Sequence, residues 1–175
     1  NYFHWVAEEL PKLRAVEFYQ DKHKEKVKLI IPSNPSGYIT ETLQCLGYSL
    51  DECMEWKYNR IQVENMVVPT FPELSKDTLT WLHKRIVGKI IQNGNDKKKN
   101  LRIYISRKDA PSRRIINEEE VIQEIEKYGF RSYQLANLSF PEQVRLFYHA
   151  EAVITTHGAG LVNLIWASNI KVIEI

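Results

Sequence analysis

The chain has 175 residues, of which 43% are hydrophobic and 26% charged, proportions of a globular protein that exclude a disordered chain and a fibrous repeat. Its formal net charge is +2, from 24 lysines and arginines against 22 aspartates and glutamates, which is too balanced to draw the whole molecule onto nucleic acid or an anionic membrane. The two cysteines, Cys45 and Cys53, are too few for a disulfide framework, and their spacing is not the C-x-x-C of a zinc knuckle or a redox pair.

The first 92 residues contain helix and strand patterns in a less regular order than the rest of the chain. In chain order, we expect a helix over residues 2–20 with a bend at Leu10 and Pro11, a buried strand over 27–31, a helix over 37–46, strand over 60–69, and a helix that begins after Ser75. The last of these helices carries an apolar stripe at helical spacing, formed by Leu79, Leu82, Ile86 and Ile90.

A polar, turn-forming segment over residues 92–100 has no large apolar side chain and predicts a linker. We therefore divide the chain into residues 1–92, a linker over 93–100, and residues 101–175. Positive charge is concentrated from Lys97 to Arg114, where eight lysines and arginines accompany one aspartate. We interpret the three lysines of the linker, residues 97–99, as solvated charges.

Strands and helices alternate after the linker. We expect strands over residues 101–106, 130–135, 152–155 and 170–175, with helices over 117–128, 140–150 and 161–167 between them. Capping boxes open the first two helices, Asn117 with Glu120 and Ser139 with Glu142. Strands that alternate with helices of about ten residues form parallel sheets through right-handed crossovers. The predicted fold class is therefore α/β, with two incomplete α/β units, and ligands are expected at the carboxyl ends of the strands.

The strongest local motif is the segment from Thr155 to Gly160, where a predicted strand enters a glycine-rich turn and then a helix. Gly158 and Gly160 would let the backbone approach a phosphate, and the N–H groups of the helix start attract anions. His157 adds a polar ring that could hydrogen-bond a ligand. The alternative is a tight structural turn without a ligand.

A second motif is the loop after the strand over 101–106. It contains Arg107, Arg113 and Arg114, and it follows a strand whose carboxyl end lies at the same sheet edge as the turn at His157. Arginine recognises phosphate oxygens in a bidentate way and stays charged in a dry site. The alternative is a solvated loop whose arginines pair with the glutamates at 118–120.

The third motif opens the chain. On a helix, Asn1, His4 and Glu8 lie on one face at spacings of three and four. A histidine oriented by a carboxylate is a common general base near neutral pH. The alternative is a core histidine among aromatic side chains.

Taken together, these motifs resemble glycosyltransferase family 61. The residues that carry the resemblance are Asn1-x-x-His4-Trp5 with Leu10-Pro11, Ile105-Ser-Arg107, Arg113-Arg-Ile115 with Asn117-Glu118, Ser139-Phe140 with Glu142-Gln143, His157-Gly-Ala-Gly-Leu161, and Val172-Ile-Glu174. The family includes plant xylan xylosyl- and arabinosyltransferases, animal O-linked N-acetylglucosaminyltransferases and microbial capsular polysaccharide proteins. The resemblance is strongest over residues 1–13 and 101–175 and thin between about 33 and 95.

The resemblance implies an inverting glycosyltransferase of the GT-B type, with two Rossmann-like halves facing a cleft. A nucleotide-diphosphate sugar would be the donor, held mainly by the second half, and a glycan or protein would be the acceptor. The donor-binding residues expected on this basis are Ser106, Arg107, Arg113, Arg114, Asn117, Glu142, His157, Gly158, Ala159 and Gly160. His4 would be the base with support from Glu8, and Asn1 and Trp5 would lie on the acceptor side.

We expect no cofactor and no metal ligand, because the chain has no Asp-x-Asp motif to hold a divalent ion across the phosphates. The expected partners are a nucleotide sugar and a glycan or glycoprotein acceptor, without nucleic acid, and with peripheral membrane association through segments outside this chain. A microbial member of the family would act at the cytoplasmic face of a membrane in polysaccharide biosynthesis. A plant or animal member would act in the lumen of the Golgi or the endoplasmic reticulum.

Two other functions are compatible with parts of the sequence. A non-catalytic domain that binds RNA or an acidic polysaccharide would use the basic stretch from Lys97 to Arg114, but would leave the motifs at His4 and His157 without a role. A nucleotide-sugar epimerase or dehydrogenase would need a G-x-G-x-x-G turn, which is missing. The chain starts at Asn1 and stops within an apolar run, so we expect a fragment that can keep its site residues and lose turnover.

Overall fold

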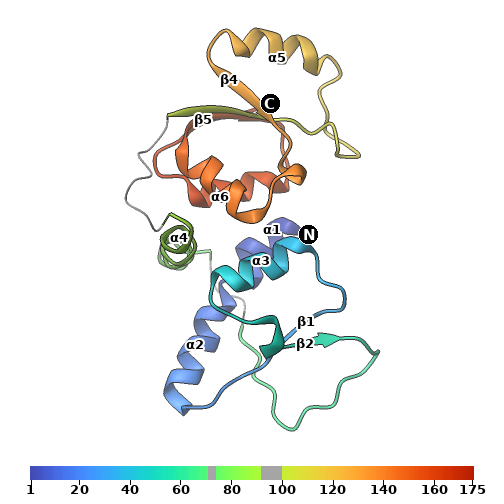
Figure 1. Cartoon of the computed structure of the whole chain (residues 1–175), viewed down its shortest axis with the longest axis vertical. Helices are drawn as coiled ribbons and strands as arrows, with labels where there is room; N and C mark the ends of the chain where they lie inside the picture. Colours follow the sequence, from blue (N-terminus) through green and yellow to red (C-terminus); the bar gives the residue numbers. More distant parts are fainter. Residues whose placement is uncertain (71–73, 92–99) are drawn as a thin grey trace. The chain divides into compact units, whose positions relative to one another are not determined.

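The computed structural model describes residues 1–70, 74–91 and 100–175. The chain divides into two compact units, Asn1–Lys89 and Ile90–Ile175 (Figure 1). The predicted linker over 93–100 lies outside the described residues except for Asn100, and so do its three lysines.

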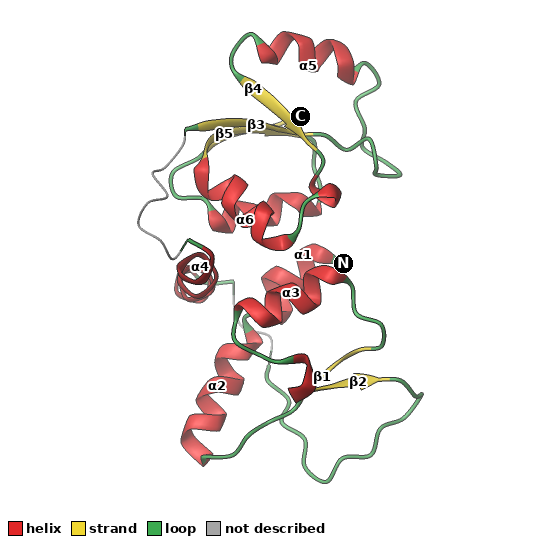
Figure 2. Ribbon diagram, viewed as in Figure 1, coloured by secondary structure: helices red, strands yellow, loops and turns green. Residues whose placement is uncertain are grey.

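Unit 1 consists of helices, long loops and a two-stranded parallel sheet (Figure 2). Its elements, in chain order, are α1 (Tyr2–His4), a π-helical turn (Trp5–Glu9), α2 (Lys12–His23), β1 (Leu29–Pro32), α3 (Gly37–Cys45), a 3₁₀ turn (Leu50–Glu52), β2 (Cys53–Trp56) and α4 (Lys76–Ile90). In the π-helical turn, the N–H of Leu10 donates to the carbonyl of Trp5 at 2.9 Å. The predicted bend at Leu10 and Pro11 is therefore present, as a turn between this segment and α2.

The core of unit 1 joins its first helices to α3 and α4. The side chains of Val6, Leu10, Leu43, Leu82 and Ile86 are at most 1% exposed. Because Leu82 and Ile86 belong to the predicted apolar stripe, the sequence pattern that placed this helix is confirmed. The burial of these side chains is the main stabilising contribution to the unit.

The predicted strand over 60–69 is wrong, because this segment forms no regular element. Its apolar residues are interrupted by a bend at Glu64 and Asn65, and Pro69 has no N–H to give to a ladder. The partner of β1 is instead β2, which pairs in parallel from Leu29 opposite Cys53 to Pro32 opposite Trp56. The strand predicted over 27–31 begins two residues later than expected, and Ile31 is its one buried residue.

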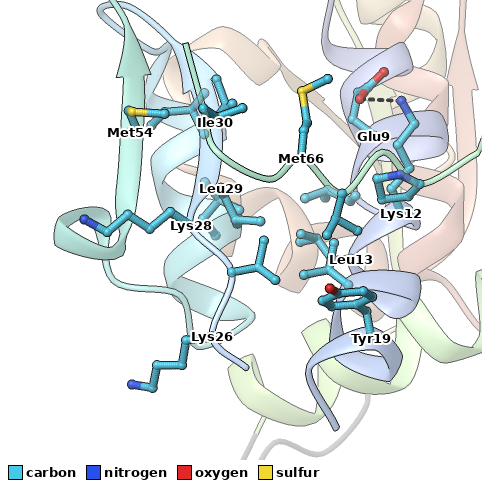
Figure 3. A pocket seen from close by; sticks show the side chains of 18 of the residues that line it. Glu9, Lys12, Leu13, Tyr19, Lys26, Lys28, Leu29, Ile30, Met54 and Met66 are labelled. Atoms are coloured by element: carbon cyan, nitrogen blue, oxygen red, sulfur yellow. Dashed lines mark hydrogen bonds and ion pairs between the residues drawn. The ribbon is translucent and has the colours of Figure 1, made fainter. Parts of the chain in front are cut away.

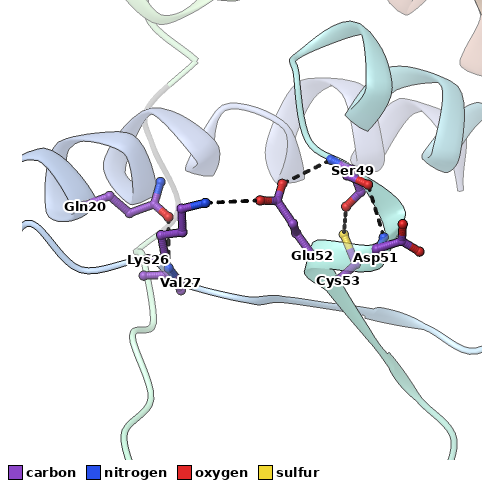
Figure 4. A network of polar contacts seen from close by, with 7 residues as sticks. All are labelled: Gln20, Lys26, Val27, Ser49, Asp51, Glu52 and Cys53. Carbon is purple, nitrogen blue, oxygen red and sulfur yellow. Dashed lines mark hydrogen bonds and ion pairs between the residues drawn. The ribbon is translucent and has the colours of Figure 1, made fainter.

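Polar contacts position the two strands of unit 1 (Figure 4). The side chain of Gln20 in α2 accepts a hydrogen bond from the N–H of Val27 at 2.9 Å, which fixes the segment that leads into β1. Lys26 forms an ion pair with Glu52 at 3.6 Å, and Glu52 completes a capping box with Ser49 at the start of the 3₁₀ turn. The segments that precede β1 and β2 in the chain are therefore in contact with each other next to the paired strands.

Unit 2 is a four-stranded parallel sheet with the strand order β4-β3-β5-β6. Its elements are β3 (Leu101–Ile105), α5 (Glu118–Glu126), β4 (Phe130–Tyr133), a 3₁₀ turn (Leu135–Asn137), α6 (Phe140–His149), β5 (Ala150–Thr155), a 3₁₀ helix (Ala159–Trp166) and β6 (Lys171–Glu174). Helices α5 and α6 lie on opposite sides of the sheet (Figure 2). The predicted α/β class with parallel sheets is confirmed.

The two predicted capping boxes have different outcomes. Ser139 and Glu142 form one at the start of α6, as expected. Asn117 does not cap α5 through its side chain, which instead donates to the carboxylate of Glu120 at 3.0 Å. The Glu120 side chain therefore contacts the amide of Asn117 and not its backbone.

A buried polar network holds the 3₁₀ helix of unit 2 in place. The Nδ2 group of Asn163 donates to Gln143 Oε1 at 3.0 Å and to the carbonyl of Gly160 at 3.1 Å, while Asn163 Oδ1 accepts from the indole of Trp166 at 2.9 Å. Asn163 and Trp166 are fully buried, and Phe140 packs edge to face on Trp166. Because buried amides need their partners, this network fixes the turn between β5 and the helix.

Among the described helices, none is long and apolar enough to span a bilayer.

Candidate functional site

Two loops meet at the carboxyl end of the sheet in unit 2. The strands that precede them, β3 and β5, are neighbours in parallel register, with Ile105 opposite Thr155. The hydroxyl of Thr156 donates to the carbonyl of Arg113 at 2.9 Å, which ties the second loop to the first. The structure therefore brings together the arginine loop and the glycine turn that the sequence predicts at one edge.

Arg107 lies directly against the glycine turn. A Cβ atom added to Gly158 would lie 1.9 Å from Nη1 and 2.8 Å from Cζ of Arg107, so the guanidinium occupies the space that a side chain at position 158 would take. Its Nη2 donates weakly to the carbonyl of Ser112 at 3.4 Å. In the described part of the chain, its buried Nε has no hydrogen-bond partner. An unpaired buried N–H of a cation is costly, and an anion would satisfy it.

The other basic residues of the loop have different surroundings. Lys108 forms an ion pair with Glu119. Arg113 and Arg114 are exposed and form no ion pair with any described residue, and Arg113 has a left-handed backbone with φ of 55°. The alternative of a solvated loop is wrong in its pairing, because among the described residues Lys108, and no arginine of the loop, forms an ion pair with the glutamates at 118–120. The exposure of Arg113 and Arg114 agrees with the rest of that alternative.

Glu118 is a buried carboxylate beneath the arginine loop, 5% exposed. Its two oxygens accept hydrogen bonds from the hydroxyls of Tyr104 at 2.8 Å and Ser106 at 3.1 Å. Burial, followed by this hydrogen bond, raises the pKa of Tyr104 above its ordinary value. Ser106 Oγ also accepts from the N–H of Lys108 at 3.3 Å. The carboxylate thus positions Ser106 and the residue that follows Arg107.

The sequence predicts Ser106 among the donor-binding residues and assigns no role to Glu118. The sequence motif contains Glu118 but gives no reason to expect its burial, since it stands among five glutamates. The hydroxyl of Ser106 donates to Glu118 and accepts from the N–H of Lys108, so it stabilises the conformation of the arginine loop.

His157 is oriented by a carboxylate at the end of the neighbouring strand. Its Nδ1 lies 2.6 Å from Glu174 Oε1, and both side chains are largely exposed, at 69% and 46%. The pair leaves Nε2 of His157 available to a ligand. Ala159 and Gly160 begin the 3₁₀ helix, where a Cβ on Gly160 would meet Leu135 Cδ1 at 2.7 Å. Glu174 was not among the predicted site residues. It lies 17 residues from His157 in the sequence, and spacing alone did not identify it as the partner of that histidine.

Two predicted donor-binding residues make contacts at helix starts. Glu142 accepts from the N–H of Ser139 at 2.8 Å and from its hydroxyl at 2.6 Å. The side-chain hydrogen bond, followed by the backbone one, lowers the pKa of Glu142. Asn117 lies at the start of α5 and contacts Glu120.

In unit 1, His4 and Glu8 form the predicted pair. His4 Nδ1 lies 2.9 Å from Glu8 Oε1, and 57% of the His4 side chain is exposed. The alternative of a core histidine is therefore wrong. The side chain of Asn1 caps α1 by accepting from the N–H of Phe3 at 3.0 Å. The indole of Trp5 donates to Thr42 Oγ1 at 2.9 Å, which fixes the ring.

A larger, mainly apolar pocket lies elsewhere in unit 1, between α2, β1 and the segment around Met66 (Figure 3). It has a volume of about 480 Å³. The ion pair of Glu9 with Lys12 lies at one side, and Lys26 and Lys28 extend away from it. Of the predicted site residues it contains Trp5 alone. Within residues 1–70, 74–91 and 100–175, three or more histidines, cysteines or acidic side chains never gather as a metal site would require.

Comparison with known proteins identifies the family. The family model described as Glycosyltransferase 61 matches residues 2–173, which is nearly the whole chain. A search of the curated proteins found no significant match. The chain belongs to glycosyltransferase family 61, as its motifs predicted.

Proposed function

From membership of this glycosyltransferase family, we propose that the protein transfers a sugar from a nucleotide-diphosphate donor to an acceptor hydroxyl with inversion at the anomeric carbon. Unit 2 holds the diphosphate at the arginine loop and the glycine turn. Unit 1 supplies the base and the acceptor-side groups. This division of roles corresponds to the GT-B type that the resemblance implies.

The proposal depends most on Arg107. Its guanidinium lies against the bare backbone of Gly158, and its buried Nε has no partner in the described chain. A phosphate oxygen would supply the missing acceptor, and the planar guanidinium can bind two oxygens at once. The absence of a side chain at Gly158 lets the guanidinium lie against the turn, where it can present its N–H groups to the anion.

Other groups in the arginine loop and the glycine turn also favour an anionic ligand. His157 presents Nε2 from the glycine turn, oriented by Glu174 at 2.6 Å. Arg113 and Arg114 add positive charge that no described carboxylate neutralises. These groups would stabilise the negative charge that develops on the departing diphosphate. We propose that they serve this purpose without a metal ion.

The chemistry on the acceptor side requires a base. The acceptor oxygen forms a bond to the anomeric carbon, its proton passes to Nε2 of His4, and the bond from that carbon to the diphosphate oxygen breaks with its electron pair. Glu8, 2.9 Å from Nδ1, holds the ring in the tautomer that leaves Nε2 unprotonated and stabilises the imidazolium that forms.

The polyanion-binding alternative loses part of its support. Two residues of the basic stretch, Arg102 and Lys108, are neutralised by Glu151 and Glu119. Charges paired in this way contribute little to the release of counterions that drives nucleic-acid binding. Among the described residues of this stretch, Arg107, Arg113 and Arg114 have no acidic partner, and they belong to the loop that meets the glycine turn.

Calorimetry with uridine diphosphate in the presence of a chelator tests the proposal. We expect binding without metal, and Arg107→Ala should weaken it by about ten- to a hundredfold, the scale of a charge-assisted hydrogen bond. Arg107→Lys should recover part of the loss, because it keeps the charge without the fork. Arg131→Ala is the matched control, since Arg131 is an exposed arginine in β4, outside the predicted site. Equal losses for Arg107 and Arg131 would favour diffuse polyanion binding, and binding that requires manganese would contradict the metal-free mechanism.

A further inference from the structure

A second pocket in unit 1 lies at the carboxyl end of β1. It is an open hollow lined by the start of the chain and by the loop from β1 to α3, and its volume is about 310 Å³. We call it the loop pocket. Its lining includes His4, Trp5, Asn34, Ser36 and Tyr38. In α/β folds, ligands bind where parallel strands end. The loop residues Asn34, Ser36 and Tyr38 are not part of any predicted site.

The polar groups of the loop pocket have free hydrogen-bonding capacity. Among the described residues, the side chain of Asn34 and the hydroxyls of Ser36 and Tyr38 have no hydrogen-bond partner, although Ser36 occupies the cap position of α3. His4 uses Nδ1 for Glu8, so its Nε2 is free as well. An amide, a hydroxyl and a phenol each donate and accept. The pocket thus offers several groups of the kind that bind sugar hydroxyls.

The ionisable side chains of the loop pocket are already paired. Glu9 contributes to the lining and forms an ion pair with Lys12 at 2.8 Å, and His4 is paired with Glu8 at 2.9 Å. A charged ligand would therefore find no opposite charge among these side chains, and it would lose its hydration on entry. The pocket favours an uncharged polar ligand.

The aromatic walls of the pocket are held in place. The Trp5 indole donates to Thr42 at 2.9 Å, and the Tyr38 ring packs edge to face on Tyr2 with centroids 5.2 Å apart. A pyranose ring matches such walls, because its C–H groups pack on an aromatic face while its hydroxyls meet polar groups at the rim. The volume is at the lower end of the range for ligand sites, which fits one sugar ring better than a peptide segment.

We propose that the loop pocket is the acceptor subsite and binds one uncharged pyranosyl residue, so that the acceptor is a glycan. This inference rests on the proposed function and specifies its acceptor. A hydroxyl of the bound ring would lie near His4, whose Nε2 takes the proton as the new glycosidic bond forms. Asn34, Ser36 and Tyr38 would select the sugar by hydrogen bonds to its other hydroxyls.

NMR titration of the ¹⁵N-labelled chain with methyl β-D-glucopyranoside tests the proposal without any nucleotide. We expect saturable shifts of the Trp5 indole N–H and of the backbone N–H groups of Ser36 and Tyr38. Ser36→Ala and Tyr38→Phe should each raise Kd by about two- to tenfold, the effect of one lost hydrogen bond. Ser33→Ala and Tyr58→Phe make the same chemical changes at exposed positions outside the pocket and should leave Kd unchanged.

Three results would overturn the inference. Shifts caused by N-acetyl-L-serinamide and not by the glucoside would identify a protein hydroxyl as the acceptor. Equal or tighter binding of methyl β-D-glucopyranosiduronate would refute the preference for an uncharged ring. No shift at Trp5, Ser36 or Tyr38 with the glucoside would remove the subsite. Because uridine diphosphate binding to unit 2 is measured separately, failure of the loop pocket leaves the donor proposal standing, and the reverse also holds.

Discussion

Gly158→Ala should weaken nucleotide binding by displacing a neighbouring side chain. An added Cβ would lie 1.9 Å from Arg107 Nη1, 2.8 Å from Cζ and 3.5 Å from Nε. Favourable contacts require about 3.5 to 4.0 Å, so the guanidinium must move by roughly 1.5 to 2 Å. With φ of −179° at Gly158, the backbone is extended and accepts alanine without strain. The methyl group therefore acts on Arg107 and not on the turn.

The expected loss follows from what Arg107 contributes. If its guanidinium binds the diphosphate, its displacement should lower the affinity for uridine diphosphate by about ten- to a hundredfold, as Arg107→Ala does. The melting temperature should change by only a few degrees, because a flexible side chain can move aside. Calorimetry gives the affinity, and calorimetric melting gives the stability. The double variant should lose no more affinity than Arg107→Ala alone, since both changes remove the same contact.

Gly88→Ala is the matched control. Gly88 lies inside α4, and a Cβ there would meet no atom within 4 Å. The substitution should stabilise the helix by about 0.5 to 1 kcal/mol and leave nucleotide affinity unchanged. Parental affinity in the Gly158→Ala variant would refute the assignment of Arg107 to the diphosphate. Unfolding of that variant at room temperature would show that the glycine serves packing.

Three further outcomes are expected. His4→Ala should lower sugar transfer by about 10²- to 10⁴-fold at unchanged uridine diphosphate affinity, and Glu8→Gln should lower it less; transfer at the parental rate in a variant that melts like the parent would mean another base. Glu174→Gln should weaken uridine diphosphate binding by about two- to fivefold in calorimetry, because His157 loses its orienting carboxylate; unchanged affinity would remove the pair from the donor site. Tyr48→Phe should leave the free energy of unfolding in urea unchanged or raise it by up to about 1 kcal/mol, because the hydroxyl is buried without a partner in the described chain. Burial raises the pKa of Tyr48 to about 12, so stability falls as pH rises from 10 toward 12, and the fall should be smaller in the variant; a marked loss of stability at pH 8 would contradict this account.

The fold of unit 2 could be predicted from sequence because its signals are local. Strand patterns, the capping box at Ser139 and the turn glycine Gly129 each lie within a few residues of the element that they define. The right-handed crossover rule then gives a parallel sheet without knowledge of any distant contact. The meeting of the arginine loop with the glycine turn followed from the same reasoning, since both loops leave the same edge.

Unit 1 was predicted less well because its sheet depends on pairing across the chain. The segment over 60–69 has the apolar content of a strand but pairs with nothing in the described residues, while β2 has a mixed pattern and is a strand only through its register with β1. β-propensity reflects such context more than it reflects the residues themselves. The same limit applies to His157 and Glu174, whose contact depends on β6 lying beside β5.

The distribution of paired and unpaired cations in unit 2 gives the strongest physical reason to place the ligand at Arg107. Lys108, the next residue, has a carboxylate from Glu119, so acidic side chains are available to this loop. Glu118 lies under the loop but is satisfied by the hydroxyls of Tyr104 and Ser106. In the described part of the chain, the buried Nε of Arg107 has no partner, a situation that costs a folded protein about 1 to 3 kcal/mol in general, and an anion that accepted its hydrogen bond would recover part of that free energy. A carboxylate from the chain itself would have removed this difference between the free and bound states, and with it much of the affinity for a diphosphate.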